Sequence, residues 1–341
     1  GFLGFGVWAH HMFAVGMGPV ADSIFALTTM LIGLPTGVKI FNWIATMYGG
    51  SLRFPTSMKF AIGLIAMFTI GGISGVMHSS PPSDLQQTDT YFIVAHFHYV
   101  LYGGAMMGIF AGIYHYFPKI TGRLMNEKIG TWQFWLNFIG LNLTFFPMHF
   151  SGMLGMPRRI YTYDAGQGWD LFNMMSTVGT YMLLVAGLLF AYNFFRSKKH
   201  GAVAGNDPWG APTLEWSIPS PPPEYNFAQI PEVTSRYPLW DLKAPEKMAG
   251  IEHSHADAMT ITDAHAVPVH EETERRTAKE LGIPIPFPTV KPFMVALGII
   301  ITLSGLIVLH AGKFPLAMAL MIGGAAFMVG SLYAWLTSPL E

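Results

Sequence analysis

The stretch that decides the fold covers residues 91–117 and reads YFIVAHFHYVLYGGAMMGIFAGIYHYF. It contains no Asp, Glu, Lys or Arg and exceeds the ~20 residues that a helix needs to cross a bilayer. Lipid offers backbone polar groups no partner, so such a segment must be helical. Similar apolar stretches occur at 20–45, 58–77, 132–150, 173–195, 292–310 and 315–336. The sequence therefore predicts an all-α fold, a polytopic transmembrane helix bundle.

The composition agrees with a membrane protein. Hydrophobic residues make up 51% of the 341 residues and charged residues only 11%, whereas soluble domains carry about 25% charged residues. The net charge of −1 gives no basic surface and so argues against nucleic acid as a partner. The absence of cysteine excludes disulfides, thiolate metal sites and thiol catalysis.

The distribution of Lys and Arg predicts the orientation of the spans. Basic residues follow the first, third and fifth spans, at Arg53, Lys59, Lys119, Arg123, Lys128, Arg196, Lys198 and Lys199. The intervening loops 12–22 and 78–90 contain none, so the basic loops are expected on the cytoplasmic side. Arg158 and Arg159 break this pattern on the opposite side and need an anion to hold them.

Three parts are expected along the chain. Residues 1–199 form the membrane core, 200–290 a cytoplasmic linker rich in Pro and His, and 291–341 a transmembrane accessory segment of two helices. The linker histidines His253, His255, His265 and His270 have irregular spacing, which is typical of solvated side chains. The apolar run 1–9 is too short to span a membrane, so we expect a truncated N-terminus.

His96 and His98 lie two positions apart inside a predicted span. At about 100° per residue, they point to nearly opposite faces of a helix. They therefore do not easily share one metal, but each can reach a separate cofactor, and imidazole is a common axial ligand of haem iron. Buried histidines bonded to neighbouring helices are the alternative, although histidine within a span usually serves function.

His10 and His11 are adjacent, where an apolar run ends near the outer side. Neighbouring side chains diverge on a regular helix, but at a helix end both can turn to one metal. Neutral imidazole suits copper, zinc or iron. Histidines that simply solvate a helix end explain the pair equally well.

Thr29, Thr36 and Lys39 fall within an arc of about 80° on the first complete span. A polar stripe of this kind faces protein or water, as a proton path requires. A lysine at the centre of a span costs about 3 kcal/mol on insertion scales. Lys39 lies within two turns of the end of the span, so it can instead snorkel to the cytoplasmic interface.

Charged residues on the outer side offer further candidate ligands or anchors. Arginine binds carboxylates through directed hydrogen bonds, so haem propionates are fitting partners for Arg158 and Arg159. An acidic patch on a partner protein and lipid head groups are the alternatives. Asp84 and Asp89 precede the span with His96. Either can hold a metal or a water network, and Asp89 can also cap the helix.

These motifs together resemble the catalytic subunit of haem–copper terminal oxidases, cytochrome c oxidase subunit I, in its C-terminal part. The resemblance runs from Gly1 to about Lys199, in the expected order and spacing. The segments that carry it are WAHHMF (8–13), PTGVK (35–39), DTYFIVAHFHY (89–99), NLTFFPMHF (142–150) and GMPRR (155–159).

The resemblance implies a role for each matching residue. His10 and His11 would be two of the three ligands of the active-site copper. His96 would bind the high-spin haem, of the a3 type, where oxygen binds, and His98 the low-spin haem, of the a type. Arg158 and Arg159 would hold the haem propionates, with Asp84 as a neighbour of the propionates. Thr36 and Lys39 would belong to a K-type proton channel. Asp89 would be a ligand of an outer magnesium site.

One residue departs from the family pattern. The family usually has His immediately before the Asp of the 89–99 motif, and here Thr88 stands there, which weakens the magnesium assignment. The third copper ligand, its cross-linked tyrosine, the other low-spin haem ligand and the acidic residues of a second proton path would precede Gly1. The chain as given is therefore expected not to turn over. After Lys199 the resemblance weakens, and the last two spans resemble the start of subunit III or a small two-helix subunit.

The implied function is reduction of O2 to water in the respiratory chain, with electrons passing from the low-spin to the high-spin haem, coupled to proton pumping. The implied partners are subunit II with its dinuclear copper, other oxidase subunits, cytochrome c and the bilayer. The implied location is the prokaryotic plasma (inner) membrane, with the linker and C-terminus in the cytoplasm. A quinol oxidase of the same family is an alternative. A metal or proton transporter using intramembrane histidines is a rival of another class, but it gives Arg158 and Arg159 no role.

Overall fold

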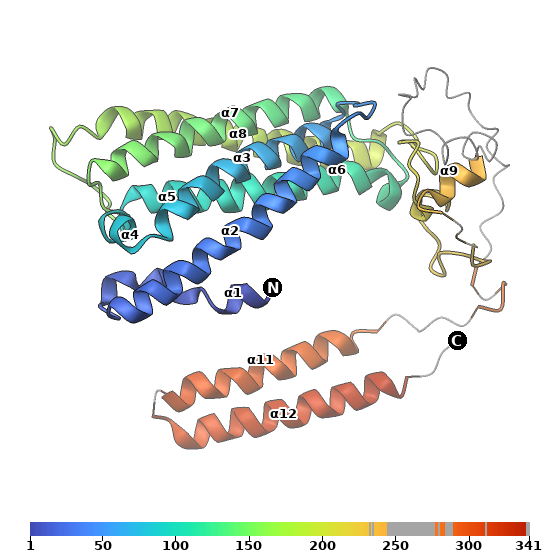
Figure 1. Cartoon of the computed structure of the whole chain (residues 1–341). Helices are drawn as coiled ribbons and strands as arrows, with labels where there is room; N and C mark the ends of the chain where they lie inside the picture. The colour runs from blue at the N-terminus through green and yellow to red at the C-terminus, as the bar shows by residue number, and fades with distance from the viewer. Residues whose placement is uncertain are drawn as a thin grey trace. The chain divides into compact units, whose positions relative to one another are not determined.

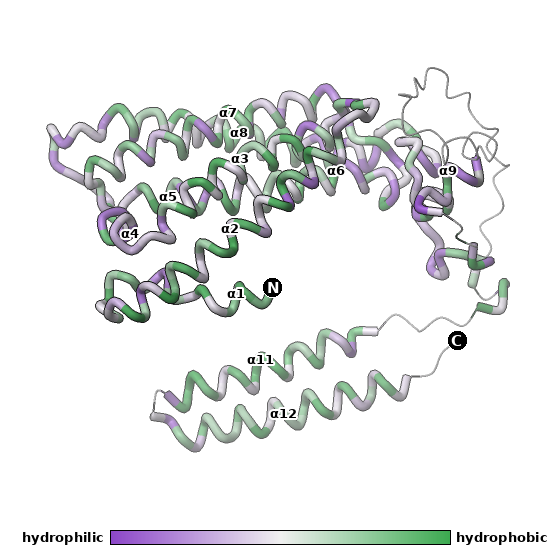
Figure 2. Tube along the Cα trace, viewed as in Figure 1, coloured by the Kyte–Doolittle hydropathy of each residue, from purple (hydrophilic) through white to green (hydrophobic). Residues whose placement is uncertain are grey.

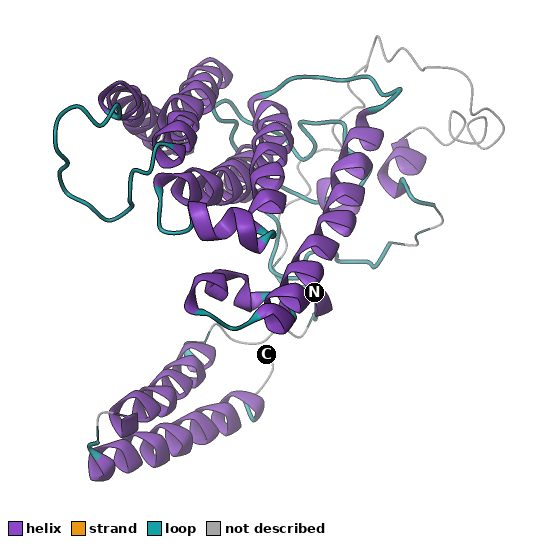
Figure 3. Cartoon of the chain, turned by 60° about the vertical axis from the view of Figure 1, so that its left-hand side comes forward, coloured by secondary structure: helices purple, strands orange, loops and turns teal. Residues whose placement is uncertain are grey.

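The computed structural model describes residues 1–231, 233, 235–243, 277–278, 280–283, 289–310 and 312–338. Within these ranges the chain consists of helices and loops, with no strand, as Figure 3 shows. Figure 1 labels the α-helices. Their bounds are α1 Phe2–Phe5, α2 Pro19–Met47, α3 Thr56–His78, α4 Pro81–Gln87, α5 Tyr91–His98, α6 Met107–Thr121, α7 Glu127–Met153, α8 Asp170–His200, α9 Pro238–Lys243, α11 Lys291–His310 and α12 Phe314–Leu336. The all-α prediction is confirmed.

Six helical segments among the described residues are long and apolar enough to cross a membrane. They are α2, α3, the continuous segment Tyr91–Thr121, α8, α11 and α12. Each coincides with a stretch predicted from the sequence. The one remaining predicted span, at 132–150, lies within α7. This helix has 27 residues, but it is not among the six helical segments that are apolar enough to cross a membrane.

Polar side chains explain why α7 differs from the other long helices. Gln133 and Asn137 on α7 are fully buried. Tyr114 of α6 donates a hydrogen bond to Gln133 (2.7 Å), and Tyr102 donates one to Asn137 (2.5 Å). These amides lower the hydropathy of α7 without facing lipid, because both are buried and their oxygens accept hydrogen bonds from the neighbouring helical segments, although Gln133 Nε2 has no partner among the described residues.

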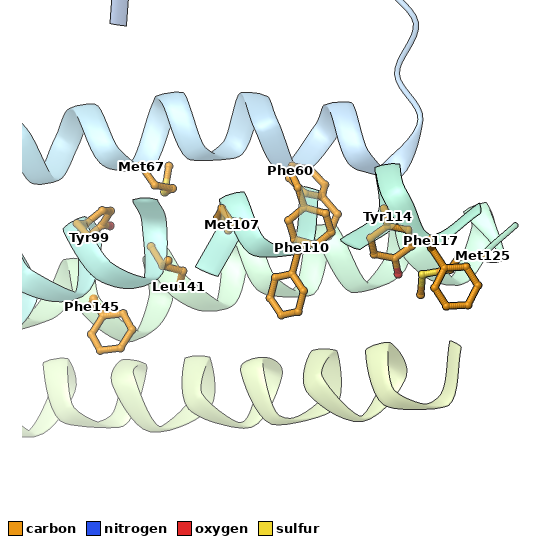
Figure 4. Close-up of a cluster of buried hydrophobic side chains, with 11 residues drawn as sticks. Phe60, Met67, Tyr99, Met107, Phe110, Tyr114, Phe117, Met125, Leu141 and Phe145 are labelled. Carbon is orange, nitrogen blue, oxygen red and sulfur yellow. The ribbon is translucent and has the colours of Figure 1, made fainter. Parts of the chain in front are cut away.

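The core of the bundle lies where α3, α6, α7 and the segment between α5 and α6 meet. Eleven buried side chains form one cluster, and Figure 4 labels ten of them. They include Phe60 and Met67 of α3, Tyr99 of the segment between α5 and α6, Met107 of α6 and Leu141 of α7. Phe60 packs edge-on to Phe134 with ring centroids 5.2 Å apart, a favoured aromatic geometry. This packing fixes the segment that carries His96 and His98.

The segment that follows α8 packs against the bundle and does not begin as an extended linker at residue 200. Trp216, in the 3₁₀ helix η3 (Leu214–Trp216), is 1% exposed. The ammonium of Lys119, at the end of α6, donates to the carbonyl of Ile218 (2.7 Å) and lies 5.3 Å from the Trp216 ring centroid. Apolar burial and a satisfied lysine therefore hold this part of the predicted linker in place. The histidines predicted at 253, 255, 265 and 270 lie outside the described residues.

The described part of the chain divides into two compact units, one with residues 1–221 and 235–243 and the other with residues 222–231, 233, 277–278, 280–283, 289–310 and 312–338. In the second unit, α11 packs along α12, and Figure 2 shows hydrophobic residues along both helices. The helices approach closely at Gly305, where an added Cβ would lie 2.4 Å from Met321. Small residues at such contacts are typical of helices packed in membranes.

Candidate functional site

The segment with both intramembrane histidines begins at a well-defined helix start. Thr90 is the N-cap of α5, and its hydroxyl accepts a hydrogen bond from the Phe92 backbone N–H (3.2 Å). After His98 the chain continues as a π-helix, η2 (Tyr99–Met106), before α6 begins. Such π-helical turns are rare and frequently lie at functional sites.

The rings of His96 and His98 contact different helices. His96 Nδ1 lies 3.0 Å from the Gly71 carbonyl of α3 and 2.9 Å from the Ser74 hydroxyl. His98 stacks on Phe145 of α7, with ring centroids 4.0 Å apart. Its Nδ1 lies 2.8 Å from the Val94 carbonyl of its own helix. One histidine therefore faces α3 and the other α7, as the two-residue spacing predicts.

The hydrogen bonds of these two histidines select a tautomer. A backbone carbonyl only accepts, so Nδ1 of both rings must carry the proton. The neutral ring then keeps a free lone pair on Nε2. Histidines that bind metals in proteins almost always donate their other N–H in this way.

Glycines on α3 make room for this arrangement. A Cβ at Gly71 would lie 2.9 Å from the Val100 backbone nitrogen, and one at Gly75 would lie 3.0 Å from His96 Cε1. Both distances are shorter than a real Cβ tolerates without a shift of the neighbour. The close approach of α3 to η2 therefore places the Gly71 carbonyl beside His96.

His10 and His11 lie on the 3₁₀ helix η1 (Trp8–Val15), which ends at Gly16 in the left-handed conformation (φ 83°). Their Nε2 atoms are 3.0 Å apart, so the adjacent rings converge. Thr29 of α2 donates its hydroxyl to the Phe25 carbonyl, which leaves its oxygen to accept from His10 Nδ1 at 3.3 Å. Burial, together with His11, lowers the pKa of His10 and favours the neutral ring.

Two further polar residues, one from α3 and one from α4, lie beside His96 and the His10–His11 pair. His78 is at the end of α3, and its ring centroid is 5.1 Å from that of His96. Asp84 of α4 is 3% exposed, and its Oδ1 lies 3.6 Å from His78 Nδ1. Asp84 partly opposes the lowering of the His10 pKa that burial causes, so it lies within electrostatic range of η1. The structure therefore gathers His10, His11, Asp84 and His96 with His78.

The polar residues of α2 lead towards His10. The Thr36 hydroxyl donates to the Ile32 carbonyl (2.9 Å), and Lys39 Nζ lies 5.2 Å from the Trp43 ring centroid. Thr29, ten residues before Lys39, contacts His10. Ten residues of α-helix extend about 15 Å. Lys39, Thr36 and Thr29 therefore lie along one helix, and Thr29 is the member of this stripe that contacts the histidine pair.

Arg158, the first residue of the outer basic pair, is bonded to Asp89 in the described part of the chain. Arg158 Nε donates to Asp89 Oδ1 at 2.8 Å, and its backbone N–H donates to the Asp89 carbonyl at 2.8 Å. Asp89 (φ 59°) and Arg159 (φ 68°) both adopt the left-handed backbone region, which is uncommon outside glycine. Arg159 is exposed and forms no such pair among the described residues. Asp89 is thus one anion that holds Arg158, a pairing that sequence reasoning did not foresee.

Sequence reasoning also missed His78 and His149. His149 of α7 lies edge-on to Phe92, with ring centroids 5.0 Å apart, and its Nδ1 lies 3.1 Å from the Phe146 carbonyl. The rarity of histidine in apolar segments could have singled out both residues. Within the described part of the chain, no three or more His, Cys, Asp or Glu residues form a group suited to a metal ion. The magnesium assignment for Asp89 therefore stays a prediction without a second ligand.

Comparisons with known proteins place this arrangement in a family. The family described as "Cytochrome C and Quinol oxidase polypeptide I" matches residues 1–182. The chain belongs to this family. A cytochrome c oxidase subunit 1 of Alkalihalophilus pseudofirmus is 44% identical over 335 residues, which are 97% of this chain and 50% of that protein. That of Bacillus subtilis is 47% identical over 266 residues, covering 78% of this chain and 42% of the relative.

The fold agrees with the family assignment. A solved structure described as a heme-copper terminal oxidase dimer matches with a TM-score of 0.52 and 19% identity, covering 59% of this chain and 41% of that one. The family member described here is a multi-pass membrane protein. It spans about half the length of the curated relatives it matches. The match to the Alkalihalophilus protein covers 97% of this chain and therefore reaches into the region of α11 and α12.

The histidines fit the cofactors that the family implies. His96 and His98 each hold Nδ1 on a carbonyl and leave Nε2 as a ligand atom. The 3.0 Å separation of the His10 and His11 Nε2 atoms is compatible with two bonds of about 2.0–2.1 Å to one ion. Copper accepts neutral imidazole of this kind.

Proposed function

We propose that this chain supplies part of the membrane-embedded catalytic subunit of a terminal respiratory oxidase. The proposed enzyme is a cytochrome c oxidase, which reduces O2 to water and couples this reaction to proton pumping. Family membership and the cytochrome c oxidase subunit 1 relatives support this proposal.

The proposed cofactors are two haems and a copper ion. His96 would hold the high-spin haem (a3 type), His98 the low-spin haem (a type), and His10 with His11 the copper. When bound, these groups supply the redox chemistry of oxygen reduction. The chain's own residues fix the ligand atoms, through the carbonyls of Gly71 and Val94.

The proposed proton path follows α2. Lys39 would take up a proton at the cytoplasmic end, and the hydroxyls of Thr36 and Thr29 would carry it towards His10. Each hydroxyl is an acceptor and a donor, so it can pass a proton along a hydrogen-bonded chain. Thr29 supports this path because it contacts His10 at 3.3 Å.

The outer side would bind the charged edges of the haems. Arg158 and Arg159 would hold propionates through directed hydrogen bonds, with Asp84 as a neighbour. Arg158 can serve a propionate only by sharing its guanidinium with Asp89 or by releasing it. Asp89 would hold the outer magnesium ion, with Thr88 standing before it where the family usually has His.

The remaining features concern assembly and place in the cell. We infer that the chain works with a subunit II that carries dinuclear copper, with other oxidase subunits and with cytochrome c as electron donor. The proposed location is the plasma (inner) membrane, with the loops after α2, α6 and α8 and the C-terminus in the cytoplasm. The basic residues of these loops support this orientation.

One observation carries the proposal. Two histidines of a single membrane segment each present an Nε2 that forms no hydrogen bond with the described residues, and their rings contact helices α3 and α7 respectively. Two separate ligands on one helix explain this geometry better than a single metal site. It also disfavours a metal transporter, in which the histidines would converge on one ion.

A reduced-minus-oxidised absorption spectrum of the full-length protein in its complex tests the proposal. The expected result is bands of two haems, one of which shifts when carbon monoxide is added. A spectrum without haem bands would refute the oxidase assignment. Extraction of the haems from the same preparation would identify their type.

A further inference from the structure

His78 is a buried imidazole whose hydrogen bonds are missing. The residue is 8% exposed, and neither Nδ1 nor Nε2 has a hydrogen-bond partner among the described residues. Buried polar groups in native proteins are nearly always paired, and an unpaired one is costly. Something other than the described part of the chain therefore faces this ring.

Asp84 is the charged group that stands beside this ring. Its side chain is buried like that of His78, at 5% and 9% exposed respectively. The contact between Asp84 Oδ1 and His78 Nδ1 measures 3.6 Å, which is too long for a hydrogen bond. A buried carboxylate thus lies next to a buried imidazole whose two nitrogens lack hydrogen bonds among the described residues.

The pair lies directly against the His96 site. The His78 ring centroid is 5.1 Å from that of His96 and 5.2 Å from that of Phe92, which it meets edge-on. Asp84 is within electrostatic range of His10. A group bound at His96 and approached by His10 would therefore pass close to both side chains.

We propose that His78 is a positioning residue that supplies a hydrogen-bond donor to the carboxylate edge of the haem at His96, next to Asp84. This inference rests on the proposed function. A haem propionate beside Asp84 would place two carboxylates together, and neither offers a donor. An imidazole can present an N–H at either ring nitrogen. His78 is the side chain placed to provide it.

A purely apolar role for His78 makes a different prediction. If the ring only packs on Phe92, leucine should replace it without consequence for the haem. If the ring donates to the cofactor, glutamine should keep part of its effect, because the amide also carries an N–H. His149 is a matched control, since its ring meets the same Phe92 edge-on but has its own partner at Phe146.

The test uses the full-length oxidase complex with His78→Leu, His78→Gln and His149→Leu. The readouts are haem content and the midpoint potential of the haem that binds carbon monoxide. Loss of the donor leaves the propionate charge less compensated, which favours ferric haem. The expected change in His78→Leu is about tenfold in the reduction equilibrium, or about 59 mV towards lower potential. His78→Gln should shift less, and His149→Leu should leave the potential in place.

The outcomes separate this inference from the proposed function. Loss of haem in His78→Leu with retention in His78→Gln also supports a donor role. Full haem content with an unchanged potential in His78→Leu overturns the inference. Equal loss of haem in the leucine and glutamine variants overturns it too, because that result assigns a packing role. Wild-type protein without a carbon monoxide-binding haem would instead refute the proposed function.

Discussion

The two histidine pairs of this chain show opposite geometry. On α5, His96 and His98 are half-buried, and their Nδ1 atoms are bonded to the carbonyls of Gly71 and Val94. On η1, the Nε2 atoms of His10 and His11 approach to 3.0 Å. One pair diverges and the other converges.

This difference follows from sequence spacing and helix type. Two positions on an α-helix differ by about 200°, so the α5 rings must contact separate surroundings. Adjacent residues on the 3₁₀ helix η1 differ by about 120°, which is less than about 200°, so their side chains can still turn towards each other and meet at Nε2. Diverging histidines suit two cofactors, whereas converging histidines suit one ion.

Loss of one ligand from η1 should have the largest effect. In His10→Ala the copper affinity should fall more than the 10–100-fold typical of second-shell changes, because a direct ligand is removed. The copper-to-haem ratio by elemental analysis checks this. His11→Ala should give the same loss, and full copper content in either variant would contradict convergence on one ion.

The variant Lys39→Met tests whether the polar residues of α2 deliver protons towards His10. Proton transfer by a positioned group contributes about 100-fold or more, so turnover should fall by that order. Oxygen consumption by the full-length enzyme measures it. Lys59→Met is the control, since Lys59 donates to Thr131 (2.7 Å), away from α2. Unchanged turnover in Lys39→Met would leave Lys39 as a snorkelling residue.

The variant Gly71→Ala tests whether the close contact between α3 and η2 positions His96. The new Cβ would lie 2.9 Å from Val100 N, and overpacking of this kind costs about 1–3 kcal/mol. The melting temperature of the complex should drop, and the carbon monoxide-bound band should shift because the His96 partner moves. Gly72→Ala is the control, because no atom lies within 4 Å of its added Cβ. Equal behaviour of the two variants would argue against a special role for Gly71.

Asp89→Asn should have the smallest effect. The ion pair with Arg158 is exposed, with 68% of the Asp89 side chain accessible, and such pairs contribute about 0.2–1 kcal/mol. The melting temperature should change little, and haem content should remain. A loss of haem in this variant would show that Asp89, and not Arg158 alone, fixes the outer loop in front of α5.

The sequence was sufficient for the fold and for the divergence of His96 and His98. Long apolar stretches predict membrane helices because lipid leaves no other solution, and spacing on a helix determines direction. The sequence did not predict how the chain packs after α8. The contacts of Trp216 with the buried Lys119 join residues far apart in the chain, and no local pattern indicates them.

Other features required coordinates for the same reason. The pair of Asp89 with Arg158 joins residues 69 positions apart, and no local pattern encodes it. The polar residues of α7 make it difficult to recognise as a membrane span from its sequence. Gln133 and Asn137 look like exposed residues in the sequence but are buried in the structure. His78 stands at the end of a span without a motif around it, so only its burial and missing partners draw attention to it.

The most direct test of the central claim compares His96→Ala with His98→Ala in the full-length protein. We predict that His96→Ala abolishes carbon monoxide binding to the reduced enzyme while the low-spin haem band remains. His98→Ala should remove the low-spin band while carbon monoxide still binds. Carbon monoxide binding that survives His96→Ala, or loss of both haems in each variant, would contradict separate cofactors on the two sides of α5.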